Sequence, residues 1–301
     1  MTTSELTFFA FAQAARQSEP RKALPPVPDL LCKRYRIERL LGVGGMGAVF
    51  RARDLLREQL GDPSPVVAIK TLNNQCAEYP DAPTLLHSEF VRTLSLRHPN
   101  IVRALHFDID SESEHPFIVL ELLTGTALDQ LLLRQPGGIS WRDLSVIGQG
   151  ILAAVDYCHE IGTVHGDIKP SNIFVGNDGV RLFDFGLGRS VLGDLPTIDA
   201  ERFNAWTPRY AAPEVLQGEP VSKASDIYSL GRVMLQLSGA LNPGAECAPH
   251  RPSSMPMPIW KILNQAIALR PSERCSARQL LHAWRRSEGR TLISRMTAVF
   301  G

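Results

Sequence analysis

Two short segments in the middle of the chain carry residues whose types and spacing suit chemistry. Residues 165–174 read HGDIKPSNIF, and an Asp-Phe-Gly triplet begins at Asp184. Asp167 can accept a proton, Lys169 can stabilise negative charge on a moving phosphoryl group, and Asn172 with Asp184 can hold a divalent metal ion. This pattern predicts a phosphoryl-transfer centre. Taken alone, D-x-K-x-x-N also fits a charged turn between a helix and a strand. The order of the other elements along the chain distinguishes a phosphoryl-transfer centre from such a turn.

The composition is that of an ordinary globular chain without a strong charge bias. Its 301 residues include 32 basic and 31 acidic ones, and 44% are hydrophobic. This balance predicts neither a nucleic-acid partner nor a membrane surface, and no stretch is long and apolar enough for a transmembrane segment. The cysteines form no C-x-x-C pair, which favours a reducing, cytoplasmic location. They are Cys32, Cys76, Cys158, Cys247 and Cys275.

The first half of the chain shows mainly strand patterns and one helix pattern. Residues 37–41 alternate weakly and run into GVGGMGAVF at 42–50, which predicts a strand, a glycine turn and a second strand. An apolar strand at 66–70 ends at Lys70. Near-helical spacing over 81–97 places Glu89 on a helix. The polar stretch 54–65 is expected to be a loop, and strands are expected at 101–107 and 117–121.

The second half is mainly helical. Ser140 with Asp143 forms a capping-box pattern that opens a helix, and this helix leads to the segment at 165–174. A loop of about thirty residues is expected after Asp184, which is long for a compact domain unless it is functional. Further helices are expected at 224–238, 259–269 and 276–284. The order therefore predicts an α+β fold with a small β-rich half carrying one helix, a connector at 122–125 and a larger helical half.

These motifs, in this order, resemble the signature set of the eukaryotic-like serine/threonine protein kinase family. VGGMGAVFRARD and HGDIKPSNIF look similar to the bacterial members of that family. The resemblance implies a bilobal kinase fold that transfers the γ-phosphoryl group of ATP to Ser or Thr hydroxyls of protein substrates. It implies a kinase domain over 35–286, with an N-lobe over about 35–121 and a C-lobe over about 125–286. Residues 1–34 would then be an N-terminal extension with a proline-rich linker, and 287–301 a tail.

The resemblance also assigns roles to the polar residues. Lys70 would bind the α- and β-phosphates, and Glu89 would pair with it. Asp167 would orient and deprotonate the substrate hydroxyl, while Lys169 would neutralise the γ-phosphate. Asn172 and Asp184 would hold Mg²⁺, with Mn²⁺ as a substitute. The expected ATP-binding residues are Leu41, Gly42, Gly44, Gly47, Val49, Ala68, Lys70, Leu120, Glu121, Leu123 and Phe174.

The stretch after the Asp-Phe-Gly triplet looks like a kinase activation segment that ends in Ala-Pro-Glu. The resemblance implies an ion pair between Glu214 and Arg274, and a buried Asp226 that supports the catalytic loop from below. Thr207 matches a threonine that contacts the catalytic aspartate and lysine. Autophosphorylation is expected, with Ser190, Thr197 and Thr207 as candidate sites.

Three departures from the family pattern stand out. Gly166 replaces the arginine of H-R-D, which implies that phosphorylation of the activation segment is not the usual switch here. Phe174 replaces an aliphatic residue in the floor of the adenine pocket. A proline-rich stretch at 239–258 replaces most of a loop and helix. Two other functions remain open at this stage, a kinase-like small-molecule phosphotransferase and a non-catalytic pseudokinase scaffold.

Overall fold

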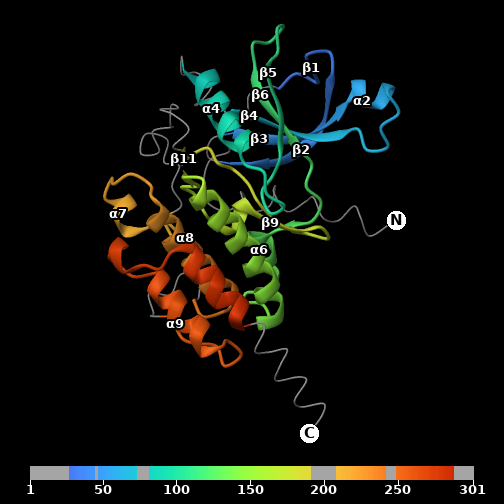
Figure 1. Cartoon of the computed structure of the whole chain (residues 1–301). Helices are drawn as coiled ribbons and strands as arrows, with labels where there is room; N and C mark the ends of the chain where they lie inside the picture. The colour runs from blue at the N-terminus through green and yellow to red at the C-terminus, as the bar shows by residue number, and fades with distance from the viewer. Residues whose placement is uncertain (1–26, 45–46, 73–80, 191–207, 242–248, 288–301) are drawn as a thin grey trace.

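Two lobes make up the computed structural model of the chain. Figure 1 shows a β-sheet with the helix α4 (Ala82–Ser95) beside it, and a group of helices on the other side of a narrow junction. The expected division into a β-rich and a helical lobe is therefore confirmed. The structure describes residues 27–44, 47–72, 81–190, 208–241 and 249–287.

The small lobe is built on a six-stranded antiparallel sheet in the order β1-β2-β3-β4-β6-β5. The glycine turn joins two neighbouring strands, and the amide of Gly44 donates to the carbonyl of Gly47 over 2.8 Å. A side chain on Gly47 would meet the backbone of Thr71 on the adjacent strand, so glycine is needed there for strand pairing. The strands are β1 (Leu30–Leu31), β2 (Tyr35–Val43), β3 (Gly47–Asp54), β4 (Val66–Leu72), β5 (Ala104–Ile109) and β6 (Pro116–Glu121).

Two expectations for this lobe were wrong in detail. The stretch 54–65 was predicted to be a loop, but it contains the short helix α2 (Leu55–Gln59), because the Asp54 side chain accepts from the amides of Leu56 and Arg57. The strand predicted at 101–107 begins at Ala104 instead. Ile101 forms only an isolated bridge to Leu182 in the other lobe.

Short strands frame the junction between the lobes. β9 (Ile173–Gly176) and β10 (Gly179–Leu182) form a hairpin directly after the 165–172 loop, whose last turn is the 3-10 helix η3 (Pro170–Asn172). β7 (Thr126–Ala127) pairs with β9, and β8 (Thr163–Val164) pairs with β11 (Arg189–Ser190). The helix α5 (Leu128–Arg134) was not predicted and begins directly after β7. These pairings fix both ends of the 165–172 loop, which is the expected catalytic loop.

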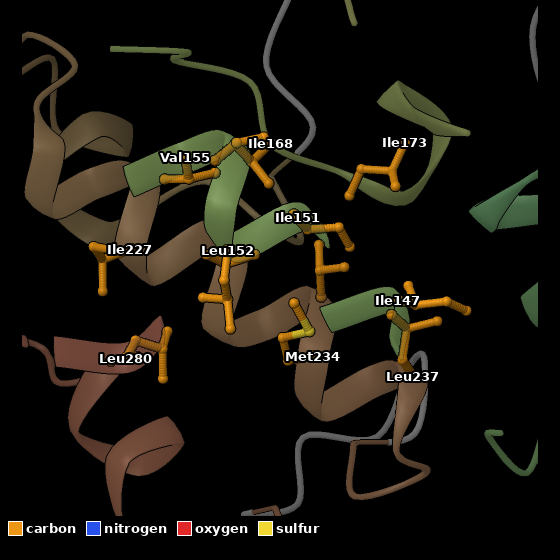
Figure 2. Close-up of a cluster of buried hydrophobic side chains, with 14 of the residues drawn as sticks. Ile147, Ile151, Leu152, Val155, Ile168, Ile173, Ile227, Met234, Leu237 and Leu280 are labelled. Atoms are coloured by element: carbon orange, nitrogen blue, oxygen red, sulfur yellow. The ribbon is translucent and has the colours of Figure 1, made fainter. Parts of the chain in front are cut away.

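The long helix α6 (Trp141–Glu160) is the centre of the large lobe. Ser140 caps it by accepting from the amide of Asp143 over 3.1 Å, as the capping pattern predicted. Figure 2 shows its apolar face packed against α8 (Lys223–Leu237), the catalytic loop and the last helix. Full burial of each Leu or Ile side chain contributes about 1.5–3 kcal/mol relative to exposure. The labelled side chains are Ile147, Ile151, Leu152, Val155, Ile168, Ile173, Ile227, Met234, Leu237 and Leu280.

The rest of the large lobe closes around this core. α7 (Pro213–Leu216) begins within the Ala-Pro-Glu motif, with Ala212 as its N-cap. α9 (Met257–Ala266) precedes the 3-10 helix η4 (Pro271–Glu273). A final helix covers 277–287. Its Trp284 is fully buried, donates from Nε1 to the carbonyl of Ser145 over 2.9 Å and lies directly on Gly148 of α6. No helix in the described part of the chain has the length and apolar character of a membrane span.

Candidate active site

Three charged side chains from both lobes meet at one point. Lys70, at the centre of the sheet, donates from Nζ to Oε1 of Glu89 on α4 over 2.6 Å. The same ammonium group donates to Oδ1 of Asp184 over 2.7 Å. Asp184 belongs to the large lobe, so this pair of contacts joins the sheet, the helix α4 and the segment after β10. The contact between Lys70 and Glu89 is the pairing that the resemblance implied.

The pKa values in this group follow from burial and from mutual charge. Burial alone would lower the pKa of Lys70, but the carboxylates of Asp184 and Glu89 raise it above its ordinary value. Burial alone would raise the pKa of Asp184, but Lys70 lowers it to about 2. Burial raises the pKa of Glu89, and Lys70 acts against that rise. The group therefore keeps a protonated lysine and an ionised Asp184 at neutral pH.

The catalytic loop brings three further predicted residues together. Lys169 Nζ lies 2.7 Å from Oδ2 of Asp167. Asn172 donates from Nδ2 to the backbone carbonyl of Asp167 over 2.9 Å and to its Oδ2 over 3.1 Å. The side chain of Asp167 is only 11% exposed, and that of Lys169 is 18% exposed. Both side chains are thus mostly buried, and their mutual contacts hold them in place.

The carboxyl group of Asp167 is electrostatically tuned toward proton acceptance. Burial raises its pKa, the Lys169 ammonium opposes that rise, and the charge of Asp184 adds to it. A carboxylate with a raised pKa is a stronger base than an ordinary aspartate, which suits general-base chemistry.

Asp226, near the start of α8, holds the catalytic loop from inside the large lobe. Its Oδ2 accepts from the amide of His165 over 2.8 Å, and its Oδ1 accepts from the amide of Gly166 over 2.9 Å. His159 Nε2 lies 2.9 Å from the same carboxylate. Asp226 is 1% exposed, so these hydrogen bonds compensate for burying its charge. The position agrees with the predicted support from below.

His165 fixes the geometry on the other side of the loop. Its Nδ1 accepts from the amide of Asp167 over 3.2 Å, so Nε2 carries the proton that is donated to the carbonyl of Phe183 over 3.1 Å. The imidazole also lies 4.5 Å from the Phe185 ring, measured between centroids. These contacts connect the catalytic loop to the segment around Asp184. The backbone φ of Asp184 is +69°. A left-handed φ at a residue other than glycine costs energy and occurs most often at functional sites.

A cavity of about 350 Å³ lies between the lobes and is lined by all eleven predicted ATP-binding residues. Ala68 and Phe174 are buried in its wall. Glu89, Lys169, Asn172 and Asp184 line it as well, so the polar residues converge on one space. Asp167 does not line this cavity but lines a smaller neighbouring hollow, and its side chain contacts Asn172 and Lys169, which do line the cavity. The cavity residues that sequence motifs missed are Val43, Thr93, Val102, Leu122, Ala127, Asp129, Gln130, Ser171 and Phe183.

The oxygen ligands of Asn172 and Asp184 in the cavity lining fit a divalent metal ion. Both contacts of the Asn172 amide nitrogen go to Asp167, which leaves the amide oxygen as its ligand atom. Oδ1 of Asp184 accepts from Lys70, and the second oxygen adds another hard donor. Within the described ranges, no group of three or more His, Cys, Asp or Glu side chains could hold a metal. One amide oxygen and one carboxylate are hard oxygen ligands of the kind that a divalent cation takes together with phosphates and water.

The end of the activation segment is anchored in the large lobe. Arg274 donates from Nη1 and Nη2 to the two oxygens of Glu214 over 2.6 and 2.7 Å, as the sequence predicted. Ser190 lies in the strand β11. Thr197 and Thr207, the other two candidate phosphorylation sites, lie outside the described residues.

Fold and site together define the class of the molecule. The sequence pattern of the protein kinase domain matches residues 35–284, and the chain belongs to the protein kinase family. Its relatives include serine/threonine-protein kinase PkaA of Streptomyces coelicolor, which is 32% identical over 84% of this chain and 49% of its own length. Pkn3 of Myxococcus xanthus is 32% identical over 72% of this chain and 40% of its own length. PknA of Mycobacterium tuberculosis is 30% identical over 83% of this chain and 60% of its own length.

These relatives support the eukaryotic-like serine/threonine kind of kinase, and all three are bacterial. The family uses ATP with a divalent metal ion. The chain spans 40% to 60% of the length of these curated relatives.

Proposed function

We propose that the chain is an active serine/threonine protein kinase that transfers the γ-phosphoryl group of ATP to protein hydroxyls. The observation that carries this proposal is that Lys70, Asn172 and Asp184 line one interlobe cavity, with Asp167 held beside it by its contact to Asn172. The Ala-Pro-Glu segment and its Arg274 anchor support a protein rather than a small molecule as the acceptor.

In the proposed reaction, each residue has one task. Lys70, held by Glu89, binds the α- and β-phosphates of ATP. Asp167 accepts the proton of the substrate hydroxyl while the hydroxyl oxygen bonds to the γ-phosphorus. The bond from the γ-phosphorus to the bridging oxygen breaks, and ADP leaves. Lys169 stabilises the charge that develops on the phosphoryl oxygens.

Asn172 and Asp184 would hold the metal, which we propose to be Mg²⁺ with Mn²⁺ as a substitute. When bound, the ion neutralises phosphate charge and orients the phosphates for in-line displacement. The bulky Phe174 forms the floor below the adenine ring, and the backbone of Glu121 and Leu123 supplies its hydrogen bonds.

We also propose the limits of the catalytic unit and its setting. The unit spans 35–286, with 1–34 and 287–301 as flanking segments. The described cysteines Cys32, Cys158 and Cys275 are free thiols, which supports a reducing, cytoplasmic environment.

The test is transfer of labelled phosphate from Mg-ATP by the purified chain. One reaction offers a generic protein with Ser and Thr acceptors, and a second offers a panel of aminoglycosides. The variant Asp167→Ala should lose at least about 10²-fold in rate, because the general base is gone. Asp178→Ala is the matched control, since Asp178 is an exposed aspartate in the β9–β10 hairpin.

The possible outcomes separate the alternatives. Label on protein that is lost only in Asp167→Ala supports the kinase. Label on the aminoglycosides alone would move the chain to the small-molecule phosphotransferases. ATP binding without any transfer would point to a non-catalytic scaffold. Mass spectrometry of the labelled chain tests autophosphorylation, which is excluded if Ser190, Thr197 and Thr207 all remain unmodified.

A further inference from the structure

A buried arginine of the small lobe hydrogen-bonds to the Asp184-Phe185-Gly186 triplet, which the Lys70–Glu89 pair also contacts. Arg92 lies on α4, three residues after Glu89, and is only 1% exposed. Its Nη2 donates to the backbone carbonyl of Gly186 over 3.1 Å. Burial lowers the pKa of this guanidinium, and the charge of Glu89 acts against that fall. A buried cation needs such partners, because an uncompensated charge in the interior is costly.

Glu89 and Arg92, both on α4, are linked to the first and last residues of the Asp-Phe-Gly triplet. Glu89 reaches Asp184 through Lys70, whereas Arg92 reaches Gly186 directly. Burial raises the pKa of Glu89, and the charges of Lys70 and Arg92 act against that rise. Arg92 therefore also favours the ionised form of Glu89, which is the form that pairs with Lys70.

Leu187, the residue after the Asp-Phe-Gly triplet, also contacts the small lobe. Leu187 is buried in a cluster with Leu72, Ala82, Leu86 and Ile118, two of which lie on α4. One face of the segment that follows Asp184 is thus bound to the small lobe by an apolar contact as well as by the arginine.

The opposite face of this segment lies against the catalytic loop with no side chain between the two backbones. Gly166 has φ +81°, and a Cβ there would lie 2.7 Å from the carbonyl oxygen of Leu187. A Cβ on Gly188 would lie 2.6 Å from the carbonyl oxygen of Val164. Gly166 has no side chain that could bind the segment after Asp184. The guanidinium that contacts this segment belongs to Arg92 on α4.

We propose that Arg92 is a positioning residue that holds helix α4 and the Asp-Phe-Gly segment in the assembled arrangement through a contact to backbone. This inference rests on the proposed kinase activity. Because the acceptor is a carbonyl oxygen, the contact needs no phosphate group. The assembled arrangement of Lys70, Glu89 and Asp184 is accordingly available to the unphosphorylated protein.

The test compares three variants of the full chain. Arg92→Met keeps the length and burial of the side chain but removes the donor, and Arg92→Lys keeps a cation that can donate to one carbonyl. Arg97→Met is the matched control, because Arg97 is an exposed arginine just beyond the end of α4. Each protein is treated with phosphatase, and kcat, the KM for ATP and amide hydrogen exchange over 186–190 are measured.

Arg92→Met should lower kcat about tenfold or more, since a hydrogen bond to a charged group is lost. The KM for ATP should change less than about twofold, because Arg92 does not line the nucleotide cavity. Exchange over 186–190 should accelerate while exchange in the β9–β10 hairpin stays the same. Arg92→Lys should recover part of kcat, and Arg97→Met should match the wild type.

The proposal is overturned if kcat and exchange in Arg92→Met equal those of Arg97→Met, or if exchange rises equally throughout the domain. The second result would mean a general loss of stability rather than positioning. If the wild type transfers no phosphate, the proposed function fails, but the exchange measurement still decides whether Arg92 holds the segment.

Discussion

At the scale of single residues, the site depends on how charges are paired inside a cavity that excludes much of the water. Asp167 has a raised pKa because it is buried, and Lys169 at 2.7 Å limits that rise. Asp184 has a pKa of about 2, because the Lys70 ammonium outweighs the effect of burial. Two aspartates of one site thus differ in basicity, as expected for a proton acceptor and a metal ligand.

The pH dependence of the reaction should report this pairing. Only ionised Asp167 can accept a proton, so activity is lost as the pH falls through its raised pKa. Lys169→Met removes the cation that limits the rise, and the acidic limb of kcat/KM against pH should therefore move to higher pH. Lys169→Arg keeps the charge and should leave the limb near that of the wild type. An acidic limb that stays in place or moves to lower pH in Lys169→Met would contradict this account.

At the scale of elements, the large lobe fixes the end of the activation segment through one arginine. The Arg274 side chain is fully buried and pairs with Glu214 of α7, and it also donates to the carbonyls of Ala224 in α8 and of Leu269 after α9. Its guanidinium lies 4.9 Å from the centre of the Tyr228 ring. A single side chain therefore joins α7, α8 and the segment that follows α9.

Removing this arginine should destabilise the domain. Arg274→Leu leaves Glu214 buried without its cation, and loss of one partner of a buried ion pair costs about 3–5 kcal/mol in free energy of unfolding. Burial alone would raise the pKa of Glu214, but Arg274 holds it below the ordinary value. The stabilisation is thus present above the ordinary glutamate pKa and is lost as the pH falls through the lowered one.

Urea unfolding at neutral and acidic pH measures this effect. The difference between Arg274→Leu and the wild type should narrow in acid, where Glu214 becomes neutral. Arg270→Leu is the control, because Arg270 is 82% exposed and its ion pair with Glu273 is on the surface. A loss below about 1 kcal/mol in Arg274→Leu would show that the pair adds little.

The sequence predicted some helices and strands but missed others. The motif residues, the strand–turn–strand and the capped helix α6 were predicted, because each depends on local chemistry that the sequence displays. The helix α2 was missed, since it depends on the side chain of Asp54 closing a turn within a polar stretch. Arg92 was missed as well, because only the folded chain brings it to Gly186, 94 positions away in the sequence.

At the scale of the whole molecule, the nucleotide cavity is formed by both lobes together. Lys70 and Asp184 come from different lobes and are 114 residues apart in the chain, yet their side chains are in contact. The cavity of about 350 Å³ has walls from the sheet and a floor from the β9–β10 hairpin. A ligand that fills it therefore bridges the lobes and stabilises their arrangement.

Binding of a non-hydrolysable ATP analogue with Mg²⁺ should raise the melting temperature. At a free ligand concentration 100 times Kd, the stabilisation is about 2.7 kcal/mol, which corresponds to about 5–10 °C for a domain of this size. In Asp184→Asn the part of the shift that depends on Mg²⁺ should shrink. Differential scanning fluorimetry with and without the metal checks this, and an undiminished metal dependence in Asp184→Asn would remove Asp184 from the metal site.

Trp284 makes the core of the large lobe depend on a helix that is synthesised late. Its indole bonds to Ser145 across 139 positions and lies on Gly148, so the core around α6 is complete only after translation has passed the final helix. The small lobe can pair its strands much earlier, since the sheet ends at residue 121. During synthesis we therefore expect the sheet to form before the helical lobe, whose apolar faces stay exposed to chaperones and proteases until its last helix is made.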